Sequence, residues 1–222
     1  MATVYRLHPE TPQARKVQAI AEALRQGAIA LYPTDTVYAI GCDLNHRGAV
    51  QRVRQLKQIA NDKPLTFLCS SLSNIADYAL VNDSAYRLIR RLIPGPFTFL
   101  LPATKLVPRL VMDPKRRTTG IRVPNSPICL ALIEALGHPI ISTSALSVVP
   151  QPTQKAKSRL IDKVEVFDAL EKLVDIIIDD EQPMAYDVST IINVIDDEPT
   201  ITRQGLGWET ACDWGAQVAS VD

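Results

Sequence analysis

The stretch AIALYPTDTVYAIG, residues 28–41, decides how this chain folds. It begins and ends with short apolar runs that have the composition of buried strands. Between them Pro33 ends the first run, because proline has no backbone N–H to donate to a sheet. The polar segment TDT at 34–36 therefore falls on a bend between two strands. Polar side chains on such a bend can face a cleft, so this stretch predicts a sheet and one wall of a binding site.

Outward from this stretch, helical and strand patterns alternate along the chain. Capping signals, such as Thr11 before Pro12 and Gly137 after an apolar run, mark helix ends. The predicted helices span 12–26, 47–58, 83–93, 127–136 and 157–172. The predicted strands span 28–32, 37–41, 65–69, 97–101, 120–123, 139–142, 174–178, 188–195 and 200–203. The last two surround the turn cluster DDEP and predict an antiparallel hairpin.

This alternation with a terminal hairpin predicts an α/β protein with a single three-layer domain and a twisted mixed β-sheet. We place that domain at 1–207, with a basic concave face, and a C-terminal tail at 208–222. The chain has 222 residues and 46% hydrophobic content, which is enough to enclose one sizeable core.

Several classes of protein are disfavoured by composition. No apolar run approaches the roughly 18 residues that a membrane span needs, and the N-terminus lacks a signal-peptide pattern, so we expect a cytoplasmic protein that does not enter a membrane. The four cysteines lie far apart and the three histidines stand in poor contexts for metal binding. We therefore predict buried free thiols and no protein-held metal.

The charged residues are distributed unevenly although the net charge is zero. Residues 1–122 carry 18 Lys+Arg and 8 Asp+Glu, whereas residues 123–222 carry 6 and 16. A basic half favours an anionic partner, and ordinary solvated helix faces are the alternative. Few aromatic residues interleave with the basic ones, which disfavours binding of single strands by base stacking.

The familiar catalytic motifs are missing from the sequence. It has no G-x-x-x-x-G-K-[ST] loop, no G-x-G-x-x-G turn between strand and helix, and no G-x-S-x-G nucleophile motif. The remaining enzymatic route is positioning plus electrostatic stabilisation by lysine, arginine and hydroxyl groups, as in phosphoryl and nucleotidyl transfer.

A set of segments carries a specific resemblance. They are YPTDTVYAIG (32–41), LKQIANDKPLTFL (56–68), PGPFTFLL (94–101), TTGIRVP (118–124), STSAL (142–146) and STIINV with ITRQG (189–205). In order and spacing they resemble the YrdC/YciO family, the threonylcarbamoyl-AMP synthases of tRNA modification. The resemblance runs from about residue 15 to about residue 205, which is most of the chain.

The resemblance implies a YrdC-like fold and a defined reaction. Family members join L-threonine and bicarbonate into a carbamate, whose oxygen attacks the α-phosphate of ATP and releases pyrophosphate. ATP is then a substrate, and Mg²⁺ is carried mainly by its phosphates. The oligomeric state is left open.

The resemblance also implies residue roles. On the L-threonine side it implies Thr36, Tyr38, Arg122 and Ser189, with the planar fork of Arg122 suited to a carboxylate. The implied nucleotide-side residues are Lys57, Lys63, Thr118, Ser142, Ser144, Thr153 and Arg203. Lys57 and Arg203 are also the catalytic candidates, and Thr153 lies in a polar, proline-containing linker over 148–157.

Three positions depart from the family pattern of an active synthase. Ile59 stands where the K-x-R element has its arginine, Leu68 where many synthases have histidine, and Leu146 where the S-A-N motif has asparagine. For Lys63, where the family often has asparagine, two readings stay open: a solvated loop lysine, or a residue that restores one positive charge to the phosphate region. A lost charge-assisted hydrogen bond costs about 1.5–3 kcal/mol, so these changes predict reduced activity and resemble the YciO branch.

Two further hypotheses stay open at this point. The same fold could hold transfer RNA or double-stranded RNA by its phosphates, without efficient synthase activity, and such binding weakens steeply with salt. A shared scaffold with different chemistry is the third reading, because fold alone does not fix function.

Overall fold

A single mixed sheet runs through the molecule. The computed structural model describes residues 1–56, 65–149 and 162–219. Within these residues eleven strands lie in the order β1-β8-β2-β3-β7-β4-β6-β5-β9-β10-β11. The strands are β1 (Thr3–Arg6), β2 (Ile29–Tyr32), β3 (Ala39–Asp43), β4 (Thr66–Leu68), β5 (Phe97–Pro102), β6 (Thr118–Arg122), β7 (Ile140–Ser144), β8 (Ile176–Asp179), β9 (Thr190–Asn193), β10 (Thr200–Arg203) and β11 (Gln217–Val218). The sheet is mixed because β1 pairs with β8 in parallel whereas β2 pairs with β3 in antiparallel.

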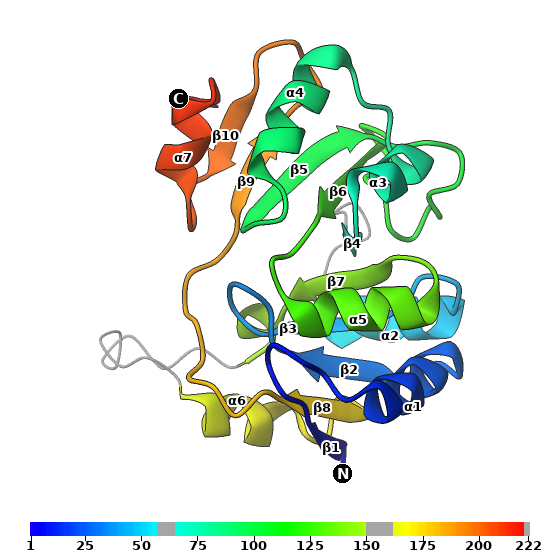
Figure 1. Cartoon of the computed structure of the whole chain (residues 1–222). Helices are drawn as coiled ribbons and strands as arrows, with labels where there is room; N and C mark the ends of the chain where they lie inside the picture. The colour runs from blue at the N-terminus through cyan, green and yellow to red at the C-terminus, as the bar shows by residue number, and fades with distance from the viewer. Residues whose placement is uncertain (57–64, 150–161, 220–222) are drawn as a thin grey trace.

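Helices cover both faces of this sheet, which makes three layers (Figure 1). The helices are α1 (Ala14–Arg25), α2 (Arg47–Leu56), α3 (Leu72–Tyr78), α4 (Asp83–Leu92), α5 (Pro127–Leu136), α6 (Lys163–Leu170) and α7 (Trp208–Asp213), with a short 3₁₀ helix at Ala145–Ser147. Buried residues of α1 and α5 form one apolar cluster with β2, β3 and β8, and the second cluster lies under α2, α3, α4 and α6. The predicted three-layer α/β fold is confirmed.

Local signals explain most of the helices. The buried residues of α1 are Val17, Ile20, Ala21 and Leu24, which are the positions at helical spacing in the sequence. In α5 the Ser126 hydroxyl accepts from the Cys129 N–H, and Gly137 ends the helix with a left-handed φ of 82°. A left-handed residue at this position is cheapest as glycine, which has no Cβ.

The structure corrects some boundaries and adds elements. The predicted cap at Thr11 is wrong, because α1 begins after Gln13 and Thr11 bonds to His8 instead. Strand β1 and helix α3 were not predicted. Residues of the predicted tail form α7 and β11, and β11 pairs with β10 in parallel. The predicted hairpin of β9 and β10 is antiparallel, as expected.

The alternation of side chains along β5 and β6 places polar residues on one face of the sheet, in an area that no helix of that face covers among the described residues. In β5, Phe97 and Phe99 point into the cluster under α4, so Thr98 between them points to the opposite face. In β6, Ile121 points into the same cluster and Arg122 points to the opposite face. The cluster that α1 and α5 cover contains no residue of β5, β6 or β9 among the described residues, so these helices do not cover that part of the sheet.

No helix of the described part of the chain is long and apolar enough to cross a membrane.

Candidate functional site

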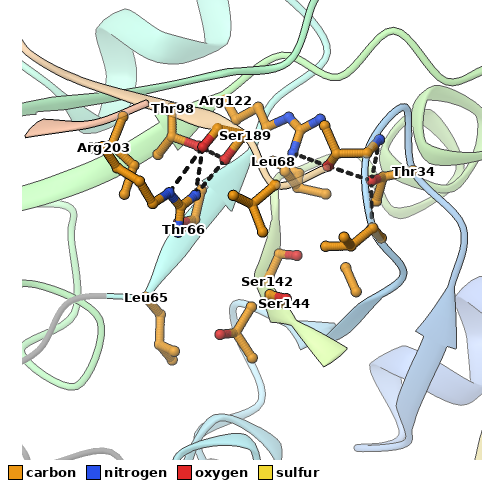
Figure 2. Close-up of a pocket in the computed structure, with 16 residues that line it drawn as sticks. Thr34, Leu65, Thr66, Leu68, Thr98, Arg122, Ser142, Ser144, Ser189 and Arg203 are labelled. Atoms are coloured by element: carbon orange, nitrogen blue, oxygen red, sulfur yellow. Dashed lines mark hydrogen bonds between the residues drawn. The ribbon is translucent and has the colours of Figure 1, made fainter. Parts of the chain in front are cut away.

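A pocket lies on this open face, and it is bounded by the bend between β2 and β3 (Figure 2). Its cavity volume is about 190 Å³. The polar lining consists of Thr34, Thr36, Thr66, Thr98, Arg122, Ser142, Thr143, Ser144, Ser189 and Arg203. The apolar lining consists of Val37, Ala39, Leu65, Leu68, Val188 and Ile191. The pocket thus brings together segments that are far apart in the chain, and the predicted bend does face a cleft.

A directed chain of hydrogen bonds organises the bend. The Thr34 hydroxyl donates to the Val37 carbonyl oxygen at 2.8 Å and accepts from the Thr36 N–H at 3.0 Å. Its proton is therefore used, so in the 3.1 Å contact between the two hydroxyls Thr36 is the donor. Thr36 in turn accepts from Nη1 of Arg122 at 2.9 Å. The bend and the guanidinium are thereby fixed relative to each other.

Arg122 also forms a buried ion pair, which sequence reasoning did not predict. Its Nη2 donates to Oδ1 of Asp35 at 2.6 Å, and the two side chains are only 8% and 12% exposed. Nε of Arg122 and Oδ2 of Asp35 are buried and have no hydrogen-bond partner among the residues that the structure describes. The guanidinium fork, which was expected to be open for a carboxylate, is thus partly occupied by the protein itself.

Arg203 and Ser189 meet at the other end of the pocket. Nε and Nη2 of Arg203 donate to the carbonyl oxygen of Ser189 at 3.0 and 2.7 Å, and Nη2 also donates to the Ser189 hydroxyl at 2.9 Å. The same hydroxyl lies 3.0 Å from the Thr98 hydroxyl. A predicted threonine-side residue and a predicted nucleotide-side residue are therefore in direct contact.

A β-bulge directs Arg203 into the pocket. Ile201 pairs with Ile192, which lies in the cluster under α4, whereas Arg203 pairs with Ile191, which lines the pocket. Residues two apart on a regular strand share a face, so the register shift between Ile201 and Arg203 moves the arginine to the opposite face. Beyond it, a Cβ at Gly205 would collide with the backbone of Ser189, so glycine permits this close approach.

The charge of the pocket is one-sided. Arg122 and Arg203 are the charged side chains in its described lining, and no carboxylate belongs to that lining. Arg203 has no acidic partner among the residues that the structure describes. Desolvation in the pocket, and then the nearby charge of Arg122, lower the pKa of Arg203 below its usual value. The guanidinium stays charged at neutral pH, and an anion would relieve this repulsion.

Two serines line the pocket on β7 and its end. The Ser142 hydroxyl accepts from the Tyr32 hydroxyl at 2.8 Å, and burial raises the pKa of that tyrosine well above its usual value. Tyr32 therefore stays a donor, and Ser142 keeps its own proton for another acceptor. Ser144 also lines the pocket. Thr118 does not belong to the lining, although it lies on the same face of β6 as Arg122, four residues away.

Tyr38 is not brought into the pocket. Its side chain is 3% exposed, and its hydroxyl donates to Oδ1 of Asp180 at 2.9 Å. Lys163 lies 5.5 Å from the Tyr38 ring and donates to the same carboxylate at 2.8 Å. Burial, and then the charge of Asp180, raise the pKa of Tyr38 strongly. The structure thus engages this side chain in a separate cluster with α6 and the end of β8.

The departures from the family pattern do not all bear on the pocket. Leu68 lines it and stands opposite Arg122 in the pairing of β4 with β6. Leu146 instead packs against the larger apolar cluster and is not part of the lining. The remaining predicted residues, Lys57, Ile59, Lys63 and Thr153, lie outside the described residues.

Sequence reasoning missed Asp35 as the partner of Arg122, and Thr66 and Thr98 as lining residues. Thr98 had a usable signal, since it is the polar residue between Phe97 and Phe99 on a predicted strand.

Burial raises the pKa values of the Cys42, Cys69 and Cys129 thiols to about 12, so these free cysteines are not nucleophiles at neutral pH. Among the described residues, no group of three or more His, Cys, Asp or Glu side chains could hold a metal ion.

Comparison with known proteins places this chain in a family. A family model named for Sua5, YciO and YrdC, with the description telomere recombination, matches residues 22–205. This chain belongs to the Sua5/YciO/YrdC family. It is 37% identical over 207 residues to the uncharacterized protein YciO of Escherichia coli (strain K12), covering 93% of this chain and 97% of that protein. The crystal structure of E. coli YciO has a TM-score of 0.82 at 36% identity, over 93% of this chain and 97% of that chain.

More distant relatives in the family are synthases. The threonylcarbamoyl-AMP synthase of Vibrio vulnificus (strain YJ016) is 31% identical over 132 residues, covering 58% of this chain and 70% of that protein. The crystal structure of Pyrococcus abyssi Sua5 complexed with L-threonine has a TM-score of 0.82 at 25% identity, over 100% of this chain and 65% of that chain. The chain is thus similar over more of its length to YciO than to the Vibrio synthase, and its fold is YrdC-like.

Proposed function

We propose that this protein binds L-threonine and ATP and forms L-threonylcarbamoyl-AMP from L-threonine, bicarbonate and ATP, at a lower rate than synthases with intact motifs. The observation that carries the proposal is the convergence of Arg122, Arg203 and the hydroxyls of Thr36, Ser142 and Ser189 around one cavity. Similarity to a structure complexed with L-threonine supports the choice of amino acid.

In this proposal two sets of residues divide the work, and they meet where Ser189 contacts Arg203. Arg122, Thr36 and Ser189 hold L-threonine, with a charge-assisted hydrogen bond to its carboxylate. Arg203 and the serines on β7 face the nucleotide, together with Lys57 and Lys63 from the segment outside the described residues. We keep Thr118 and Thr153 as nucleotide-side candidates and Tyr38 as a threonine-side candidate on the resemblance alone.

The chemistry suits this set of side chains. The carbamate of L-threonine is already an anionic nucleophile, so its attack on the α-phosphate needs alignment and charge neutralisation more than a protein base. Arg203 has donors and no acidic partner among the described residues, which suits it to the charge that develops on the α-phosphate and the departing pyrophosphate. Mg²⁺ would arrive with the phosphates of ATP.

The direct test is release of pyrophosphate. Purified protein at high concentration is incubated with ATP, bicarbonate and L-threonine, and pyrophosphate and the threonylcarbamoyl adenylate are measured. We expect slow release that requires all three substrates and falls about 10–100-fold in Arg203→Gln. The matched control is Arg87→Gln, because Arg87 is an exposed arginine on α4 away from the pocket. Release that does not exceed the ATP-only blank would rule out the proposed reaction.

Binding of transfer RNA or double-stranded RNA remains a separate prediction from the sequence. A filter-binding or fluorescence titration at low and high salt tests it, since phosphate contacts must weaken as salt rises.

A further inference from the structure

The charge balance of the pocket depends on one residue that does not line it. Two guanidinium groups, those of Arg122 and Arg203, face the cavity, and Asp35 is the carboxylate that pairs with one of them. Without Asp35 the two arginines would present two uncompensated positive charges to any ligand. With Asp35 in place, the described part of the pocket has a surplus of one positive charge.

The hydrogen bonds of Arg122 limit what it can offer a ligand. Nη1 donates to Thr36 and Nη2 donates to Asp35, while Nε is buried and has no partner in the described part of the chain. Thr36 and Asp35 thus use two of the five N–H donors, and the buried Nε lies away from the surface that a ligand meets, so the guanidinium offers a ligand only part of its donors. Such a partly occupied guanidinium suits a single carboxylate better than a phosphate, which gains most from bidentate contact and from extra positive charge.

We propose that Asp35 is a positioning residue that sets the charge preference of the pocket, so that it accepts an amino acid with one carboxylate and disfavours ligands with a second negative charge at this end. The proposal deepens the proposed function, because it takes a neutral zwitterionic amino acid such as L-threonine as the ligand. Asp35 acts through Arg122: it orients the guanidinium and offsets its charge.

A purely structural role for Asp35 makes a different prediction. If the ion pair only holds the bend in place, neutralising Asp35 weakens the binding of all ligands by a similar factor. If Asp35 sets the charge preference, the same change alters the ratio between ligands, because an unbalanced positive charge attracts a net negative ligand and not a neutral zwitterion. The ratio of affinities separates the two roles.

The experiment compares ligands of similar size and different charge by isothermal titration calorimetry on the full chain. L-threonine is a neutral zwitterion at pH 7, L-aspartate carries one net negative charge, and inorganic phosphate is an anion without an amino group. In Asp35→Asn, where the amide oxygen can still accept from Nη2, we expect L-aspartate to gain at least tenfold relative to L-threonine. We also expect phosphate to bind at least tenfold more tightly, and Asp35→Glu to keep the wild-type ratio.

Controls locate the effect. Asp175→Asn makes the same exchange in a different ion pair, in which Oδ2 of Asp175 lies 3.0 Å from Nη1 of Arg52 and which does not line the pocket. It should change neither the ratio of L-aspartate to L-threonine affinity nor the affinity for phosphate. Adding Arg203→Gln to Asp35→Asn should remove the gain in phosphate binding. Asp35→Ser is the second neutral variant if Asp35→Asn does not fold by circular dichroism.

The outcomes decide the proposal separately from the reaction. If a neutral variant folds and the ratio of L-aspartate to L-threonine affinity is unchanged, the proposal is overturned. It is also overturned if neither neutral variant folds, because Asp35 then serves the fold alone. If the wild-type chain binds no L-threonine but neutral variants gain phosphate binding, the proposed function is wrong and the role of Asp35 stands.

Discussion

The two ends of the pocket hold their arginines in opposite ways. Arg122 is buried, bonded to Thr36 and paired with Asp35, so its orientation is set before any ligand arrives. Arg203 is more exposed and has no acidic partner among the described residues, and the atoms that accept from it are an uncharged carbonyl and a hydroxyl. Under the proposed function, this difference suits the Arg122 end to selectivity and the Arg203 end to holding negative charge.

The contrast has one limit, which is that the two ends share a residue. Ser189 accepts from Arg203 through both its carbonyl and its hydroxyl, and it faces the cavity that Arg122 also lines. A ligand at one end that displaces this hydroxyl must therefore change the other end. We expect the binding of amino acid and nucleotide to be coupled rather than independent.

The largest effect should come from breaking the buried pair. Arg122→Gln leaves Asp35 as an unpaired buried charge, so the free energy of unfolding should fall by about 3–5 kcal/mol. L-threonine affinity should fall by up to about a hundredfold, since one charge-assisted bond of up to about 3 kcal/mol accounts for that factor. Urea denaturation and calorimetry measure the two effects. The double variant with Asp35→Asn should regain stability and not binding. Full recovery of binding would show that Arg122 does not contact the ligand.

A smaller effect should report the link between the two ends. Arg203→Gln should reduce pyrophosphate release about 10–100-fold, because it removes charge-assisted bonds worth about 1.5–3 kcal/mol. Ser189→Ala should weaken L-threonine binding about tenfold. In the double variant the losses in kcat/KM for L-threonine should not add, with a coupling of about 0.5–3 kcal/mol for residues in direct contact. Steady-state kinetics on the four proteins measures this coupling, and strict additivity would mean that the ends work separately.

Local periodicity was sufficient for the elements that bury a clear apolar face. Helix α1 and strand β2 follow from their patterns, whereas β3 (Ala39–Asp43) lies two residues beyond the predicted strand 37–41. Strand β1 was missed because its residues are mostly exposed and its partner β8 lies about 170 residues further along the chain. Strand β11, with two exposed residues, depends in the same way on its pairing with β10. Edge strands of this kind are determined by tertiary pairing rather than by local pattern.

In the candidate site too, some features follow from local sequence and others depend on tertiary contacts. Thr36, Arg122 and Ser189 were predicted from motif segments, and the structure brings them to one cavity. The pairing of Asp35 with Arg122 joins residues 87 positions apart, and no local pattern specifies it. The direction of Arg203 depends on a β-bulge, which reverses the face expected from strict alternation after Ile201. Long-range pairing and local irregularity were therefore the parts that sequence reasoning could not reach.

The smallest effect should separate the two leucines that replace polar family residues. Leu68 lines the pocket opposite Arg122, whereas Leu146 packs against the apolar core outside the lining. Leu68→His should therefore strengthen L-threonine binding by up to about tenfold, which corresponds to one added hydrogen bond. Its free energy of unfolding should fall by about 1–3 kcal/mol, because a polar ring enters a buried position. Leu146→Asn should leave binding within about twofold of wild type, since a net change below about 0.4 kcal/mol is expected for a side chain that does not contact the ligand. Calorimetry with L-threonine and thermal unfolding on both variants give the comparison. If Leu146→Asn improved binding and Leu68→His did not, the polar deficit would lie at the 3₁₀ helix rather than beside Arg122, and the selectivity assigned to the Arg122 end would have to move with it.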